Sequence, residues 1–407
     1  MISKLLKNTT ISNVEFNEDD NFLKKIYQKE GYLINDIINK KFYEDLFVCT
    51  EALNYVNLVS KKSLDCLVYL YKKYKFFFLK DIESILFVLA ACGELPTFKF
   101  YFNLYNLENK KDNEILKKLY LVSIMYDNLE VFIFLKENNN LDYIEFLEDY
   151  PVFLFAAENG SIKIINWFIK KDINVIKYGK NRMAIVKAAE YDKLDVLYFL
   201  IKNGANVNVK DEDGKSALMF AVENGNTYTV EVLLNKGANV NMKDKKNDTA
   251  IIIAAYRGYT EIVKKLLEKN ANIIEKNKYG YTPLLKATLY GHTEIIKMLL
   301  EKGANINEKN DEGLTALIIA AKEGEKDAVE ILLNYEKIVN KKNKKLKVNE
   351  KDNEGKTALI YAAGEGHKDI VKLLLDYGAK VDIKDKKRKT AIDYAKTEEI
   401  KQMLLKA

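Results

Sequence analysis

The stretch YGYTPLLKATLYGHTEIIKMLLEKGA, residues 279–304, decides the fold of this chain. Its triplet Thr282-Pro283-Leu284 recurs as Ser/Thr-Ala/Pro-Leu/Ile, with successive offsets of 33, 33, 33, 42 and 33 positions. The first residues of these triplets are Ser216, Thr249, Thr282, Thr315, Thr357 and Thr390. Self-similarity at a constant period of this length indicates stacked units rather than a single globular core.

The recurring residue types predict two helices in each unit. The Ser or Thr that opens each triplet can cap the first helix, because its hydroxyl accepts hydrogen bonds from backbone N–H groups. Pro283 suits the first helical position, where no backbone bond is lost. Gly280 and its equivalents suit the tip of the connecting hairpin, which needs a positive φ. Arg388 stands at that position in the last unit, so we expect that hairpin to be distorted.

This pattern resembles the ankyrin repeat. The resemblance rests on Tyr279–Leu284, Gly291-His292, Ile295-Ile296, Leu299-Leu300 and Gly303-Ala304. It implies an all-α, ankyrin-repeat solenoid of about eleven helix-turn-helix units joined by short β-hairpins. The histidine that follows Thr-Pro-Leu in the family is absent, since Leu285 and its equivalents stand there.

Toward the N-terminus the period is marked only by one small residue in each unit. It falls at Ala188, Ala156, Ser123, Ala90 and Val59, with gaps of 31 to 33 residues. We therefore expect an N-terminal helical cap over residues 1–45 and divergent ankyrin-like repeats over 46–180. Well-formed ankyrin repeats with a C-terminal capping helix are expected over 181–407.

Composition narrows the class of protein. The chain has 407 residues, 48% hydrophobic and 30% charged, which argues against a mainly disordered protein. The net charge is +6, but Arg occurs only three times, and nucleic-acid surfaces rely on Arg. The longest apolar run, Ile85–Cys92, is too short to span a membrane. We expect a cytoplasmic monomer with no membrane span and no nucleic-acid partner.

Residues for catalysis or metal binding are scarce. The chain has two histidines, His292 and His367, and both follow a glycine where the resemblance implies a structural His. The three cysteines have neither CxxC spacing nor proximity in sequence to a histidine. We therefore predict no enzyme activity, no catalytic residues, no metal site and no cofactor.

The resemblance also implies a binding groove lined by hairpin tips and by outward positions of the first helices. Carried over position by position, it gives Tyr191, Tyr256, Arg257, Tyr279, Tyr281, Leu289 and Tyr290, with Asp213 and Glu312 on the polar rim. An aromatic centre within a polar rim is typical of protein-binding hot spots. The alternative is that tyrosine, with 26 residues, is simply abundant in this chain.

A nine-residue expansion lengthens one unit around residues 336–348. It carries Lys337, Lys341, Lys342, Lys344, Lys345 and Lys347. Such a run suits a solvated loop, or an electrostatic tether to RNA or an anionic surface. Our leading hypothesis is a non-enzymatic scaffold that binds a partner protein in the groove. The alternatives are an exported effector that engages a host or competitor protein, and the tether.

Overall fold

The computed structural model describes residues 82–108, 113–138, 151–177, 179–335 and 346–407. They fall into two units, one with residues up to 123 and 130–139, the other with 124–129 and 140–407. The expected cap over 1–45 and the unit around Val59 lie outside the described residues. Within those ranges the regular elements are helices, so the predicted all-α solenoid is confirmed.

The first unit holds most of four helices with an aromatic core. They are α6 (Ile82–Cys92), α7 (Leu95–Glu108), α8 (Asn113–Met125) and α9 (Leu129–Asn138). Phe98 and Phe102 stack one turn apart on α7, with ring centroids 5.5 Å apart. Phe134 of α9 meets both rings edge-on, at 6.0 and 5.6 Å. Aromatic side chains thus hold α7 and α9 together.

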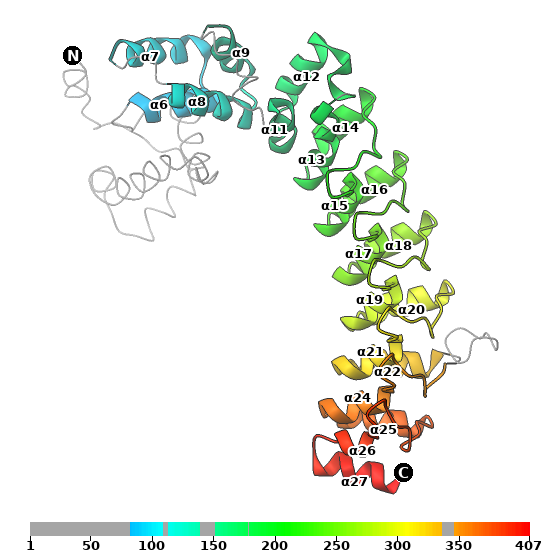
Figure 1. The fold of residues 1–407 in the computed structure, drawn as a ribbon. Helices are drawn as coiled ribbons and strands as arrows, with labels where there is room; N and C mark the ends of the chain where they lie inside the picture. Colours follow the sequence, from blue (N-terminus) through cyan, green and yellow to red (C-terminus); the bar gives the residue numbers. More distant parts are fainter. Residues whose placement is uncertain (1–81, 109–112, 139–150, 178, 336–345) are drawn as a thin grey trace, which may run out of the picture. The chain divides into compact units, whose positions relative to one another are not determined.

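The second unit repeats a pair of short antiparallel helices (Figure 1). Its first helices are α11 (Val152–Asn159), α13 (Ala184–Glu190), α15 (Ala217–Glu223), α17 (Ala250–Arg257), α19 (Pro283–Leu289), α21 (Ala316–Glu323), α24 (Ala358–Glu365) and α26 (Ala391–Tyr394). Its second helices are α12 (Ile162–Lys171), α14 (Leu194–Lys202), α16 (Thr227–Asn235), α18 (Thr260–Glu268), α20 (Thr293–Glu301), α22 (Lys326–Leu333), α25 (Lys368–Asp376) and α27 (Glu398–Lys406). Two 3₁₀ turns, η4 (Ile173–Ile176) and η5 (Gly179–Met183), lie between α12 and α13.

The first helices stack more extensively on one another than the second helices do. Alanine pairs explain this closeness, because they put no bulk between neighbouring backbones. Ala254-Ala255 and Ala320-Ala321 are fully buried in this row. The leucines, isoleucines and valines of both rows fill the space between the helices, so each unit completes the core of its neighbours.

Each connecting hairpin is organised by one Asp or Asn at its start. Oδ1 of Asp211 accepts from the backbone N–H of Asp213 at 3.0 Å and of Lys215 at 2.7 Å. Asp244, Asn277, Asn310, Asp352 and Asp385 repeat this pair of bonds. The connections are turns: within the described residues the only bridge outside helices joins Lys210 and Ser216, and no strand forms.

Successive hairpins are joined by one backbone bond each. The N–H of Lys245 donates to the carbonyl of Asp213 at 2.8 Å, and four further bonds continue the ladder. They run from Lys278 to Lys246, Asp311 to Tyr279, Asn353 to Glu312 and Lys386 to Glu354. The hairpins therefore form a continuous edge that keeps their tips in register.

The helix caps follow the prediction except at Thr249. The hydroxyls of Ser216, Thr282, Thr315 and Thr357 accept from the third helical N–H at 3.3 to 3.4 Å. Thr390 forms a capping box with Asp393. Thr249 makes no such bond, and its buried Oγ1 has no partner. Its φ of −104° is within 4° of the −100° of Thr357, which does cap its helix, so the backbone angle does not explain the missing bond.

The expected distortion of the last hairpin is wrong. Arg388 adopts φ 61°, close to the 77° of Gly280 and the 59° of Asn247. The usual bond from Asp385 N–H to the Lys389 carbonyl forms at 2.9 Å. Asn247 shows that a Cβ fits at this position even where the next hairpin follows, and the longer Arg388 side chain has more room because no later hairpin stacks on it within the described residues.

Candidate partner-binding surface

The hairpins and the C-terminal ends of the first helices form one continuous surface of the second unit, here called the first-helix surface. The hairpin ladder aligns the loops, and the alanine-packed row aligns the helix ends. Residues 33 positions apart consequently lie side by side on this surface. Most of the residues predicted to contact a partner lie on it.

Tyr256 and Tyr290 form the centre of this surface. Tyr256 is in the last turn of α17, and Tyr290 is the residue that ends α19. Their rings meet edge-on with centroids 4.9 Å apart. They remain 38% and 47% exposed, so both rings are available to a partner while each limits the motion of the other. Tyr290 also stacks on His292, at 6.2 Å.

Two cations flank this tyrosine pair. The ammonium nitrogen of Lys286 lies 5.5 Å from the centroid of Tyr256 and 4.3 Å from that of Tyr281. The guanidinium carbon of Arg257 lies 5.4 Å from the Tyr256 centroid, and Arg257 also pairs with Glu223 at 3.8 Å. Tyr256, Arg257, Tyr281, Lys286 and Tyr290 are called the tyrosine cluster below.

The cluster disfavours ionised phenols. Burial, followed by the negative charge of Glu312, raises the pKa of Tyr281. Burial, followed by a hydrogen bond with Tyr256, raises the pKa of Tyr290. Both hydroxyls therefore stay protonated at neutral pH, as hydrogen-bond donors beside cationic side chains.

The remaining predicted contact residues are not members of the cluster, although Leu289 directly precedes Tyr290 and the charge of Glu312 acts on Tyr281. Tyr279 is at a hairpin tip, 53% exposed, with the Lys278 ammonium 4.9 Å from its ring. Leu289 is half-buried at the end of α19. Tyr191 ends α13, two units away, with its ring 5.8 Å from the Lys187 ammonium. Asp213 is exposed in the first hairpin.

The prediction missed one repeat position that faces this surface. Four residues after the capping Ser or Thr stand Phe220, Lys286, Tyr361 and Tyr394. Each pairs with the residue before its cap, which is Lys215, Tyr281, Lys356 and Lys389 respectively. Aligning the units shows the signal, because one member of each pair is a lysine and the other an aromatic residue.

The last two units anchor their tyrosines to the hairpin. The Tyr361 hydroxyl donates to Oδ2 of Asp352 at 2.7 Å, and the Tyr394 hydroxyl donates to Oδ2 of Asp385 at 2.7 Å. Burial and the bond to Asp352 raise the pKa of Tyr361. The ammonium of Lys356 lies between the two rings, 5.3 Å from Tyr361 and 5.5 Å from Tyr394.

The histidines connect neighbouring units. A ring nitrogen of His292 lies 3.2 Å from the Tyr256 carbonyl oxygen, and His367 makes the same contact with Lys322. Across the described residues no three His, Cys, Asp or Glu side chains form a group suited to a metal ion.

Of the predicted lysine loop, only its end is described. Lys337, Lys341, Lys342, Lys344 and Lys345 lie outside the described residues. Lys347 is engaged locally: its ammonium pairs with Glu350 at 3.0 Å, and its N–H donates to Oδ1 of Asn307 at 2.9 Å.

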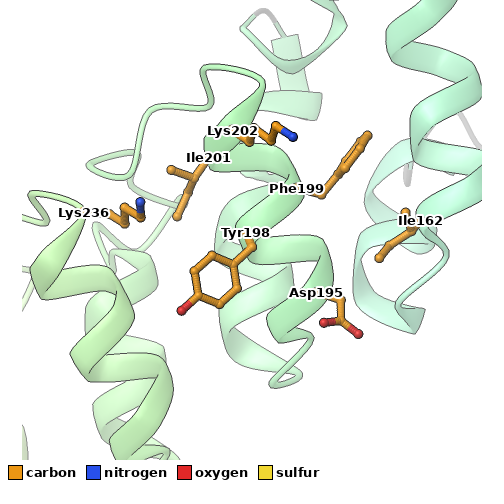
Figure 2. Close-up of a pocket in the computed structure, with 7 residues that line it drawn as sticks. All are labelled: Ile162, Asp195, Tyr198, Phe199, Ile201, Lys202 and Lys236. Atoms are coloured by element: carbon orange, nitrogen blue, oxygen red, sulfur yellow. The ribbon is translucent and has the colours of Figure 1, made fainter.

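A shallow hollow of about 600 Å³ opens among the second helices (Figure 2). It is lined by Ile162 of α12, by Lys236, which follows α16, and by Asp195, Tyr198, Phe199, Ile201 and Lys202 of α14. Figure 2 shows Phe199 directed toward the helix that carries Ile162. Apolar and oppositely charged groups mix in this lining, and no single ligand chemistry emerges from it.

In the part of the chain that the structure describes, no helix combines the length and apolar character needed to cross a bilayer.

Comparison with known proteins identifies the repeat. The family model described as ankyrin repeats (3 copies) matches residues 153–244, 239–310, 303–385 and 338–406. An ankyrin repeat protein of Borreliella burgdorferi is 29% identical over 99 residues, which are 23% of this chain and 24% of that protein. Alpha-latroinsectotoxin-Lt1a of Latrodectus tredecimguttatus is 33% identical over 78 residues, 19% of this chain and 6% of the toxin. The matches thus span a quarter or less of either relative.

Two solved structures match part of this chain. The human ASB11 ankyrin repeat domain has 28% identity and a TM-score of 0.48, covering 54% of this chain and 96% of that domain. The ankyrin repeat domain of Bcl-3 has 22% identity and a TM-score of 0.47, covering 57% of this chain and 99% of that domain.

Proposed function

This chain belongs to the ankyrin repeat family, and on that premise we propose that it is a non-enzymatic scaffold that binds a partner protein at the tyrosine cluster. Ankyrin repeats are generally protein–protein interaction domains, and the family is typically non-enzymatic. The partner, in this proposal, is a cytoplasmic protein.

The observation that carries the proposal is the exposed pair of Tyr256 and Tyr290. Aromatic rings that are 38% and 47% exposed, 4.9 Å apart and flanked by Lys286 and Arg257 combine the residue types that dominate binding hot spots. The rings are already held by each other and by the cations, so a partner orders few side chains when it binds.

Chemistry suggests what part of a partner would fit here. The rings offer apolar faces, while Lys286 and Arg257 offer positive charge beside them. A partner segment with an apolar side chain next to a carboxylate would satisfy both features. Glu223, which pairs with Arg257 at 3.8 Å, would then exchange part of this contact with the partner's carboxylate.

The test is affinity capture from the native lysate with the full chain, followed by quantitative mass spectrometry. The wild type is compared with Tyr256→Ala/Tyr290→Ala and with a control, Tyr228→Ala/Tyr377→Ala. The control removes two tyrosines, 59% and 40% exposed, from α16 and the end of α25. We expect one partner to be retained by the wild type and the control but lost from the cluster variant.

The captured partner is then purified and its dissociation constant measured. Removing both cluster tyrosines is expected to weaken binding by roughly 100-fold, since a hot-spot tyrosine contributes about 1–2 kcal/mol. Equal retention by the cluster variant and the wild type, with unchanged helical circular dichroism, would refute the proposed site.

A further inference from the structure

The last hairpin differs from the five before it in charge. Its six residues 384–389, with the sequence KDKKRK, contain five cations and one acid. All five cationic residues are exposed. Among the described residues none of the five forms an ion pair. Glu354 of the adjacent hairpin pairs instead with Lys356 of its own hairpin, at 2.8 Å.

The single acid in this hairpin is directed inward. Oδ1 of Asp385 accepts from the N–H groups of Lys387 and Lys389, at 2.8 and 2.9 Å, while Oδ2 accepts from the Tyr394 hydroxyl at 2.7 Å. Asp385 is only 7% exposed. Its carboxylate therefore stabilises the turn and is sterically covered, and the cationic side chains lie outside it.

Arg388 occupies an unfavourable backbone conformation. Its φ of 61° is left-handed, and the equivalent positions hold Gly214, Asn247, Gly280, Gly313 and Gly355. Gly or Asn adopts this conformation at lower cost than Arg does. A strained residue that persists where a relaxed one would fit is a marker of function. Here the strain keeps a guanidinium at the tip of the hairpin.

The hairpin also ends the ladder of backbone bonds. The carbonyl oxygens of Asp213, Lys246, Tyr279, Glu312 and Glu354 each accept an N–H from the following hairpin. The equivalent oxygen, that of Lys387, accepts none within the described residues. In five hairpins this carbonyl oxygen accepts a backbone N–H. In the sixth, which carries the cationic side chains, no N–H of the described residues bonds to it.

We propose that the hairpin formed by residues 384–389 is a docking site for an acidic polypeptide segment. The carboxylates of that segment pair with Arg388 and the neighbouring lysines, and one of its N–H groups bonds to the Lys387 carbonyl. Arg favours such partners, because its planar fork binds carboxylates with two hydrogen bonds.

A nucleic acid fits the same charges less well. Base stacking needs an open aromatic face. Tyr394 is the ring nearest the hairpin, and the ammonium groups of Lys356 and Lys389 both lie 5.5 Å from its centroid. The site lies apart from the tyrosine cluster and does not depend on the function proposed for that cluster.

The probe is a fluorescein-labelled octaglutamate peptide, and its binding to the full chain is measured by fluorescence anisotropy at low salt. The test variant, Arg388→Asn/Lys389→Asp, copies Asn247-Asp248 of the second hairpin, which has the same turn. It changes the hairpin charge by three units, and we expect affinity for octaglutamate to fall at least about tenfold. Asn suits a positive φ, whereas the Lys389 contact with Tyr394 is lost, so the two effects oppose each other and the variant should remain folded at the assay temperature, as circular dichroism will check.

Two further variants make the result specific. Lys245→Ser/Lys246→Ser removes two exposed cations from the second hairpin and should leave octaglutamate affinity within about twofold of the wild type. Tyr256→Ala/Tyr290→Ala should likewise bind the peptide normally, which separates this site from the tyrosine cluster.

Three results would overturn the proposal. The first is no binding of octaglutamate by the wild type, and the second is equal binding by the wild type and Arg388→Asn/Lys389→Asp. The third is tighter binding of octauridylate RNA or of phosphatidylserine vesicles than of octaglutamate, because the hairpin would then serve a nucleic acid or a membrane surface.

Discussion

The ammonium nitrogen of Lys286 lies 4.3 Å from the centroid of the Tyr281 ring. In the last unit the same two repeat positions carry the opposite types, with the Lys389 ammonium 5.5 Å from the Tyr394 centroid. The attraction between a cation and a ring face does not depend on which position supplies the cation. Pairs of this kind join four of the hairpins to the first helix that follows.

Replacement of Lys286 by Met tests this coupling. Met preserves most of the side-chain length but removes the charge that contacts Tyr256 and Tyr281. We expect the free energy of unfolding to fall by about 0.5–1 kcal/mol, the usual size of an exposed cation–π interaction. Urea denaturation followed by circular dichroism measures it. The ammonium of Lys322 lies 5.8 Å from one ring only, so Lys322→Met should lower the free energy of unfolding by less than Lys286→Met does.

The cap at Thr249 should respond to mutation differently from the others. Its buried Oγ1 makes no hydrogen bond, so Thr249→Val removes an unsatisfied polar group and is expected to leave stability unchanged or raise it by up to about 1 kcal/mol. Thr282→Val removes a hydroxyl that accepts from Leu285 N–H at 3.3 Å and should cost about 1 kcal/mol. Equal losses in the two variants, measured by urea denaturation, would contradict this assignment.

Alanine substitutions at two glycines can distinguish the cost of backbone strain from the cost of a steric clash. Gly280 and Gly303 have φ of 77° and 93°, so Ala is strained at both. A Cβ on Gly280 would lie 2.5 Å from the Asp311 nitrogen, whereas a Cβ on Gly303 would meet nothing within 4 Å. We expect Gly303→Ala to cost about 1 kcal/mol and Gly280→Ala more than about 2 kcal/mol. Thermal and urea unfolding of both variants should rank them in this order.

Ionisation of the Tyr191 phenol should make the free energy of unfolding depend on pH in the alkaline range. Burial, followed by a hydrogen bond to Glu158, raises the pKa of Tyr191 from 10.0 to about 12. Because folding raises this pKa, the stabilisation is fully present below pH 10 and is lost as the pH rises toward 12. The difference in free energy of unfolding between wild type and Tyr191→Phe should therefore shrink between about pH 9 and 11.5. If the difference in free energy of unfolding stays constant over this range, the prediction is wrong.

Much of the first-helix surface could be predicted from the repeat alone. Tyr256 and Tyr290 are 34 positions apart, one period plus one, so stacking necessarily puts them in adjacent units. Lys286 was missed because its side chain leaves the middle of a helix, and only the rotamer and the neighbouring rings determine that it lies over Tyr281. Tyr191, by contrast, occupies a groove position two units from the cluster, and its contact with Lys187 is local.

By itself, the sequence determined the elements, their caps and their stacking order, because these depend on local backbone preferences repeated every 33 residues. Only the tertiary structure decided which departures from the repeat pattern change the local hydrogen bonding or backbone conformation. At Thr249 the buried hydroxyl is left without a hydrogen-bond partner, and at Arg388 a left-handed conformation is held where no later hairpin stacks within the described residues. Such local conformations depend on the steric room and the hydrogen-bond partners that neighbouring units provide. A repeat pattern describes what the units share and therefore does not contain these differences.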